Sequence, residues 1–168
     1  MKRLLAAALA VVCLSGCAGY RLGDVKPRDL GDIRTIAVLN FRNNTSNPRI
    51  ETLVTNTVIK QFQHDGTFQI TTPEKADAVL DGAVVAVSRS PTRSVRGNVL
   101  ATNEFNLTLT VSYTLRDKTG KPRIGPASIS GGTSFFVGRD VTTEERQALP
   151  LAAEGLATRL VSQISEGW

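Results

Sequence analysis

The run Leu14–Cys17, at the end of the first apolar segment, contains the residues of this chain best suited to a chemical reaction. Small side chains at Ser15 and Gly16, directly before a cysteine, are typical of a bacterial lipobox. In that motif the cysteine thiol takes a diacylglyceryl group, and a peptidase then cleaves the chain in front of it. We therefore predict that Cys17 is lipidated and becomes the first residue of the mature protein.

The segment before this cysteine has the composition of a cleaved signal. Lys2 and Arg3 give it a positive start. The apolar run over 4–14 has 11 residues, whereas a helix that spans a bilayer needs about 20. We predict a lipoprotein signal peptide over residues 1–16, followed by a lipidated N-terminus and linker over 17–32.

Lipid anchoring of this kind is stable, because each buried CH₂ group contributes about 0.8 kcal/mol and a bacterial lipoprotein carries two or three chains. The residue after the lipidated cysteine is Ala18. In many Gram-negative bacteria an aspartate at that position retains a lipoprotein in the inner membrane. Its absence favours the outer membrane, with the protein on the periplasmic side.

Residues for catalysis or metal binding are sparse. The single histidine, His64, lies where a helix is expected to end, a place that suits a cationic or dipolar side chain. Asp77 and Asp81 share one face of an expected strand, but no histidine or cysteine lies near them, so solvation or pairing with arginine is favoured over a metal or acid–base site. Cys13 and Cys17 both lie in the signal and lipobox, which leaves no disulfide. We predict no enzyme, no catalytic residue, no metal and no cofactor.

Length and charge set broad limits. Residues 33–168 are enough for a single domain with its own core. Removal of Lys2 and Arg3 with the signal leaves 18 of the 20 Lys and Arg against 15 Asp and Glu. This mild positive balance favours an acidic partner such as anionic lipid, and no nucleic-acid partner is expected.

The first half of the domain is expected to be a strand followed by a helix. The run 33–41 is almost continuously apolar and rich in β-branched residues, which predicts a central strand, and 42–46 is a polar turn. Asn47 and Pro48 are a suitable N-cap and first helical residue. Apolar residues then recur at helical spacing until Gly66, which is placed to end the helix.

The second half is expected to contain three strands and a helix. Strands are predicted over 76–89, over 105–116 with unbroken alternation, and over 128–137, the last two joined as an antiparallel hairpin. Gly131 and Gly132 indicate a bulge or a close approach.

The last helix is expected to begin at a capping box formed by Thr142 and Glu145. Pro150 should either kink this helix or separate its first turn. The order β-α-β-β-β-α predicts an α/β fold, a two-layer sandwich in which a four-stranded mixed sheet carries both helices on one face.

Four segments carry a resemblance to a known family: Gly19–Leu22, Ile36–Thr45, Ala76–Gly82 and Asp117–Lys121. The chain resembles the lipopolysaccharide-assembly lipoproteins of the LptE family over essentially its whole mature length. That resemblance implies an outer-membrane lipoprotein that sits in the lumen of the β-barrel translocon LptD. It further implies roles as plug, assembly factor and lipopolysaccharide-binding component.

Three groups of residues are candidates for those contacts. A hydroxyl-rich strand face suits a polar barrel lumen, although a plain solvated face is the alternative. Arginines in one loop suit lipid A and core phosphates, and a second basic cluster lies at the opposite end of the same strand. Solvated loops are the alternative for both. The groups are Thr108, Thr110, Ser112 and Thr114; Arg89, Arg93 and Arg96; and Lys118, Lys121 and Arg123.

A second class of protein also fits the first β-α unit. The segment from Ile36 to Val58 is similar to the opening of lipoproteins that activate peptidoglycan synthases and of curli-secretion lipoproteins. The short linker and the strand that begins ADAVLDG, followed by a long hairpin, favour the lipopolysaccharide-assembly family.

Overall fold

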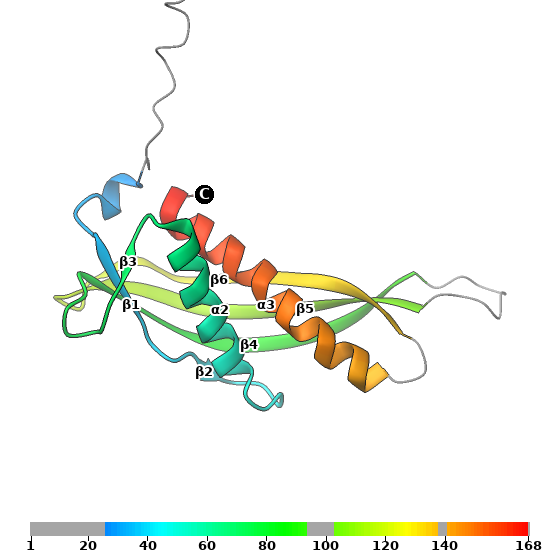
Figure 1. The fold of residues 1–168 in the computed structure, drawn as a ribbon. Coiled ribbons are helices and arrows are strands. Elements are labelled where there is room, and N and C mark those ends of the chain that lie inside the picture. The colour runs from blue at the N-terminus through cyan, green and yellow to red at the C-terminus, as the bar shows by residue number, and fades with distance from the viewer. Residues whose placement is uncertain (1–25, 94–102, 138–140, 168) are drawn as a thin grey trace, which may run out of the picture.

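A mixed sheet covered on one face by two helices forms the fold (Figure 1). The computed structural model describes residues 26–93, 103–137 and 141–167. Its elements in chain order are η2 (Arg28–Leu30), β1 (Thr35–Val38), β2 (Arg42–Asn43), α2 (Ile50–Asp65), β3 (Gln69–Ile70), β4 (Ala78–Arg93), β5 (Asn103–Asp117), β6 (Pro122–Val137) and α3 (Val141–Glu166).

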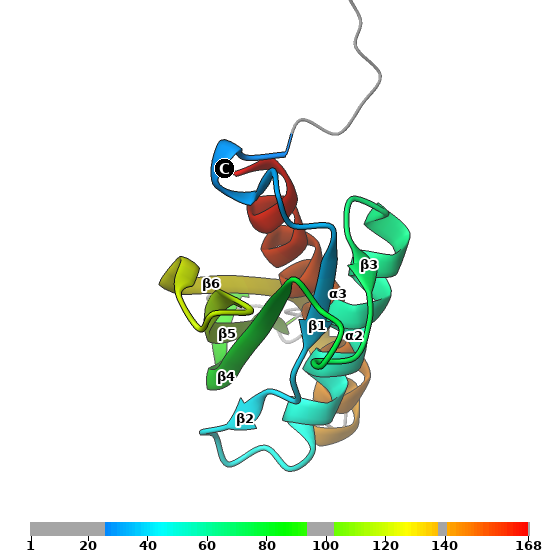
Figure 2. The same cartoon turned by 90° about the vertical axis from the view of Figure 1, so that its left-hand side faces the viewer.

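Three long antiparallel strands, β4, β5 and β6, dominate the sheet, whose order is β3-β1-β4-β5-β6. The short strands β1 and β2 both pair with β4 in parallel, and β3 pairs with β1 in parallel. Both helices lie on one face, where α2 packs on α3 and α3 packs on β6 (Figures 1 and 2). The predicted α/β sandwich, with a mixed sheet and a long hairpin, is therefore confirmed.

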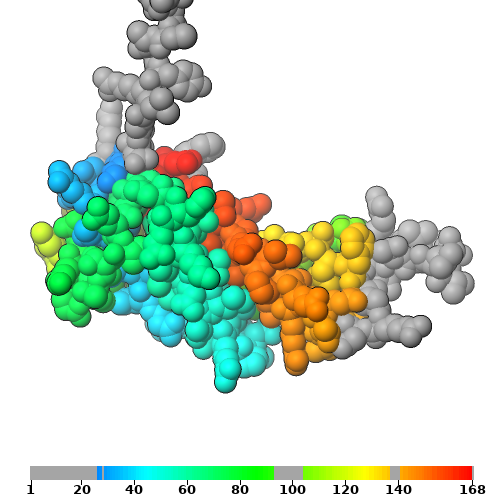
Figure 3. Space-filling view, viewed as in Figure 1, coloured from blue at the N-terminus to red at the C-terminus, as the bar shows by residue number. Residues whose placement is uncertain are grey.

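The alternation of β5 decides which face is covered. Leu107, Leu109, Val111 and Leu115 are fully buried beneath the helices. Each of them alternates with a polar residue on the opposite side of the strand. Figure 3 shows the helical layer from outside, with α2 and α3 side by side over the sheet.

The sheet has more strands than the sequence predicts. The run 42–46 was expected to be a turn, but Arg42 and Asn43 form β2 beside Ala83 and Val84 of β4. The second addition is β3, just after the first helix. Two-residue strands carry too little sequence for a period to appear. They form because a neighbouring strand, β4 for β2 and β1 for β3, offers backbone hydrogen-bond partners.

The start of the first helix also differs from the prediction. Helix α2 begins at Ile50, and Arg49 occupies the N-cap position in the left-handed conformation, with φ 62° and no side-chain cap. Asn47 instead accepts a hydrogen bond at its carbonyl from the Asn43 amide, 2.8 Å away, which holds it in the preceding turn. The predicted end is confirmed, because Gly66 has φ 78° and donates its N–H to Phe62.

The last helix begins before the predicted capping box. Helix α3 already includes Val141, so Thr142 lies inside it, and the carboxylate of Glu145 pairs with Arg89 across the fold at 2.6 Å. The helix runs through Pro150 as one element, so no first turn is separated.

Gly131 marks a close approach of helix and sheet. A Cβ atom there would overlap the backbone of Leu156 in α3, so the approach predicted for the glycine pair is confirmed. The irregularities of the sheet lie elsewhere, for example in β4 between Val84 and Ala86.

The segment before β1 also contributes to the core. Leu30, which the sequence places in the linker, is fully buried in the apolar cluster. Pro27 lies close to Gly167, so the beginning and the end of the described chain meet at one end of the fold (Figure 1).

Tyr113 of β5 is expected to cost stability. Its hydroxyl is buried and, within the described residues, is the one buried side-chain polar atom without a hydrogen-bond partner. Burial also raises the pKa of Tyr113. Tyr113→Phe should therefore increase the free energy of unfolding by about 1 kcal/mol, measured by urea titration at neutral pH. A lower urea midpoint for the phenylalanine variant would contradict this expectation.

Candidate functional site

The face of the sheet opposite the helices carries many hydroxyl side chains, and we call it the hydroxyl face. Thr108, Thr110, Ser112 and Thr114 of β5 are all partly exposed on this face, as their alternation predicts. The hydroxyls of Thr110 and Ser130 are hydrogen-bonded at 2.8 Å. By the strand register, further polar residues of the same face stand on β4, β5 and β6: Ser88, Ser90, Asn106, Ser128, Ser130 and Ser134.

This hydroxyl face has its charges toward its margins. Asp81 pairs with Arg42 at 3.6 Å where β2 meets β4. Glu104 stands at the other end, opposite Phe136, which is 59% exposed. The centre of the face can therefore donate and accept hydrogen bonds without desolvation of a charge.

Arg89 of the predicted arginine cluster is bound to the helical layer. It stands opposite Leu107 in the register, on the helix side of the sheet, and its guanidinium pairs with Glu145 of α3. The same group lies 5.8 Å from the ring centroid of Phe105. Arg89 thus ties β4 to α3, an interaction hidden from the sequence because its partner is 56 residues away.

Of the other two arginines of that cluster, the structure describes only the backbone of Arg93. Arg93 is the last residue of β4 and pairs through its backbone with Glu104. Arg96 lies outside the described residues.

In the second basic cluster, Arg123 is engaged in contacts within the fold, whereas the two lysines are not buried. This side chain donates to the carbonyl of Asp29 and the carboxylate of Asp32, and lies 3.6 Å from the carboxylate of Asp117. These contacts, which we call the Arg123 clamp, join the segment before β1 to the β5–β6 turn. Lys118 and Lys121 remain exposed on that turn.

The two aspartates singled out in the sequence each contact another segment of the chain. One carboxylate oxygen of Asp77 accepts the N–H groups of Arg34 and Thr35 and the hydroxyl of Thr35, at 2.9 to 3.1 Å. The N–H of Arg34 first, then the hydroxyl and N–H of Thr35, lower the pKa of Asp77. Asp81 pairs with Arg42, in line with the expected pairing with arginine.

Metal-ligating side chains do not gather in the part of the chain that the structure describes. No group of three or more His, Cys, Asp and Glu residues there could hold an ion.

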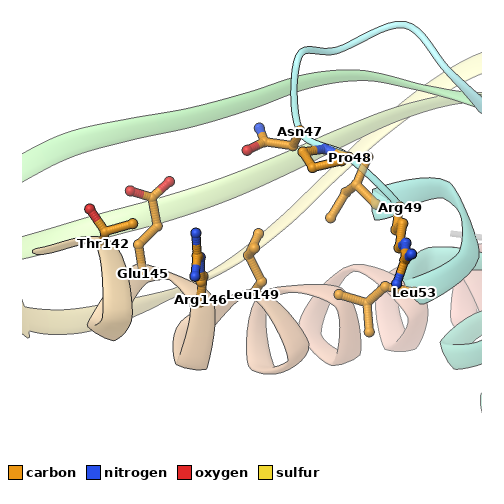
Figure 4. A pocket seen from close by; sticks show the side chains of 9 residues that line it. Asn47, Pro48, Arg49, Leu53, Thr142, Glu145, Arg146 and Leu149 are labelled. Atoms are coloured by element: carbon orange, nitrogen blue, oxygen red, sulfur yellow. The ribbon is translucent and has the colours of Figure 1, made fainter.

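A cavity that the sequence does not reveal lies where the start of α2 faces the first turns of α3 (Figure 4). Its volume is about 740 Å³, and Arg49 and Arg146 both line it. These residues are 97 positions apart, so no local spacing could have linked them.

Comparison with known proteins decides the family. The family model for lipopolysaccharide assembly, LptE, matches residues 33–164. The chain belongs to the LptE family. The matched range contains the whole sheet, all of α2, all of α3 except its last two residues, and all three groups of candidate binding residues. No curated protein sequence matches the chain.

Solved structures of two bacterial lipoproteins share the fold. Lipoprotein B from Nitrosomonas europaea is 14% identical, with a TM-score of 0.54, over 89% of this chain and 92% of that one. The minor lipoprotein from Acinetobacter baumannii is 19% identical, with a TM-score of 0.50, over 80% of this chain and 92% of that one. At these identities the likeness to the LptE-family chain shows the fold alone.

None of the helices in the described ranges is apolar and long enough to cross a membrane.

Proposed function

We propose that this LptE-family protein is an outer-membrane lipoprotein, anchored through Cys17 on the periplasmic side, that plugs and helps to assemble the LptD barrel. In that position it binds lipopolysaccharide for insertion into the outer leaflet. The observation that carries the proposal is the uncovered hydroxyl face, in a chain whose family assembles lipopolysaccharide. The role is one of binding and assembly rather than catalysis.

The chemistry of the hydroxyl face suits a barrel lumen. The interior of an outer-membrane barrel is polar, so its plug must offer hydrogen bonds over a broad surface. Threonine and serine do this at a lower desolvation cost than charged side chains. We place Thr108, Thr110, Ser112 and Thr114 against the barrel wall.

The length of the strands fits the same role. Strands β4 and β6 have 16 residues each, which is roughly 50 Å at about 3.3 Å per residue. The apolar band of an outer-membrane barrel is about 25 Å tall. A domain of this length can fill the barrel and still extend beyond it.

For the lipopolysaccharide contact we propose the arginine loop between β4 and β5. Of its three arginines, Arg89 is engaged with Glu145, which leaves Arg93 and Arg96 as the main phosphate contacts. At the other end of β5, Arg123 is engaged in its clamp, so Lys118 and Lys121 are the secondary candidates.

Reversing both charges of the loop should weaken lipopolysaccharide binding by well over tenfold. Charge-assisted hydrogen bonds contribute about 1.5 to 3 kcal/mol each when partly desolvated, and Arg93→Glu with Arg96→Glu removes two of them. The measurement is binding of the purified lipoprotein to lipopolysaccharide at two salt concentrations, with circular dichroism to verify folding.

The matched control makes the same change at the opposite end of β5. Lys118→Glu with Lys121→Glu alters the net charge equally and, because these lysines are only the secondary candidates, should weaken binding less than the arginine pair does. If instead the lysine pair abolishes binding and the arginine pair does not, the contact lies at the β5–β6 turn.

Affinity purification from solubilised membranes tests the partner. We expect the full-length lipoprotein to bring down LptD in a fixed ratio. Recovery of a penicillin-binding protein without any barrel would favour the peptidoglycan-synthase activators instead. Depletion of the lipoprotein should also lower the amount of assembled barrel.

A further inference from the structure

The cavity between the helices has an apolar floor and a basic rim. Ile50 is fully part of the core, while Leu53 and Leu149 pack against it and stay partly exposed. The volume of about 740 Å³ falls within the range of roughly 300 to 1,000 Å³ that is usual for small-ligand sites. Such a floor can accept an acyl chain in place of water.

Two arginines stand at the rim without carboxylate partners. Arg49 precedes α2, Arg146 belongs to the first turns of α3, and both line the cavity (Figure 4). Within the described residues neither guanidinium forms an ion pair. The carboxylate that lines the cavity, Glu145, is neutralised by Arg89 at 2.6 Å. The rim therefore presents an uncompensated positive charge.

Two guanidinium groups on either side of an apolar floor match one chemical class of ligand. Arginine binds phosphate through two parallel hydrogen bonds. Leu149 and Leu53 lie between the two arginines (Figure 4), so each arginine can take a phosphate of its own while an acyl chain of the same molecule lies over the leucines. Inorganic phosphate would use the rim alone, and a neutral lipid would use the floor alone.

We infer that this cavity binds the lipid A part of lipopolysaccharide, with one phosphate at Arg49, one phosphate at Arg146 and one acyl chain on the apolar floor between them. The inference rests on the lipopolysaccharide binding proposed above and adds a second contact. That contact lies in the helical layer, on the opposite side of the sheet from the hydroxyl face (Figure 2).

The backbone of Arg49 offers a way to separate binding from folding. Its φ of 62° lies in the left-handed region, which glycine adopts without strain. Arg49→Gly should therefore weaken binding while the urea midpoint of unfolding stays the same or rises. If Arg49 served stability alone, Arg49→Gly would lower the urea midpoint and leave binding unchanged.

The experiment measures binding of rough lipopolysaccharide to the immobilised full-length lipoprotein in dodecyl maltoside. We expect Arg49→Gly and Arg146→Gln each to weaken binding only about tenfold, since both residues are exposed and solvent screens their charges. Lys60→Gln, which removes one charge from an exposed site on the same helix, should have no effect. Lipopolysaccharide stripped of its lipid A phosphates should bind the unchanged protein at least tenfold more weakly than the intact molecule does, and Arg49→Gly or Arg146→Gln should weaken its binding no further.

Unchanged affinity in both folded arginine variants would overturn the inference. So would variants that lose affinity for dioctanoyl phosphatidate and keep it for lipopolysaccharide, because the cavity would then be a phospholipid site. These results leave the proposed function standing as long as Arg93→Glu with Arg96→Glu still weakens binding. Failure of the unchanged protein to bind lipopolysaccharide at all would contradict both the inference and the proposed binding function.

Discussion

Gly131→Ala should lower the free energy of unfolding by about 3 kcal/mol, the largest loss expected from any single methyl group in this fold. The added Cβ would overlap the backbone of Leu156 and of Gly155 in α3. A flexible side chain could move aside, but helix backbone cannot, so α3 would have to lift from β6. That movement would expose core residues such as Leu160 and Ile164.

Urea titration of the purified protein measures this loss. Ser134→Ala is the matched control, because Ser134 lies on the same strand but on the exposed face, and its effect should stay within about 0.5 kcal/mol. Equal midpoints for Gly131→Ala and the control would show that α3 does not rest on Gly131 as described.

Cys17→Ala should abolish lipid attachment completely. Without the thiol no diacylglyceryl group can be added, and the lipoprotein peptidase cannot cleave the precursor. Metabolic labelling with palmitate should give no labelled band, and the protein should accumulate at the length of the uncleaved chain.

Cys13→Ala is the control for this experiment. It removes the other cysteine, in the apolar part of the signal, and should leave labelling and cleavage intact. Label retained by the Cys17→Ala protein, together with fractionation in the outer membrane, would contradict the lipobox interpretation.

The parts of the fold that follow a period were predictable. The alternation of β5 identified its buried face, because in a long strand every second residue repeats the signal. The end of α2 at Gly66 was predictable for a similar reason, since a glycine is suited to the left-handed backbone that ends a helix. Short strands such as β2 carry no period and depend on a neighbour that is already in place.

The candidate site was less predictable, because its charges are paired across the fold. The sequence grouped Arg89 with Arg93 and grouped Arg123 with two lysines, by proximity along the chain. Arg89 instead binds α3, and Arg123 binds the segment before β1. Likewise, Arg49 and Arg146 line the same cavity only because α2 packs against α3.

Site-specific photocrosslinking in living cells tests the central claim most directly. A photoreactive residue at Thr110 or at Ser112 stands in the middle of the hydroxyl face, and we expect both to capture LptD as the main product. The same residue at Lys60, on the exposed side of α2, shows whether the helical layer also reaches the barrel. Crosslinks from both hydroxyl-face positions to peptidoglycan synthases, with no barrel captured, would contradict the account.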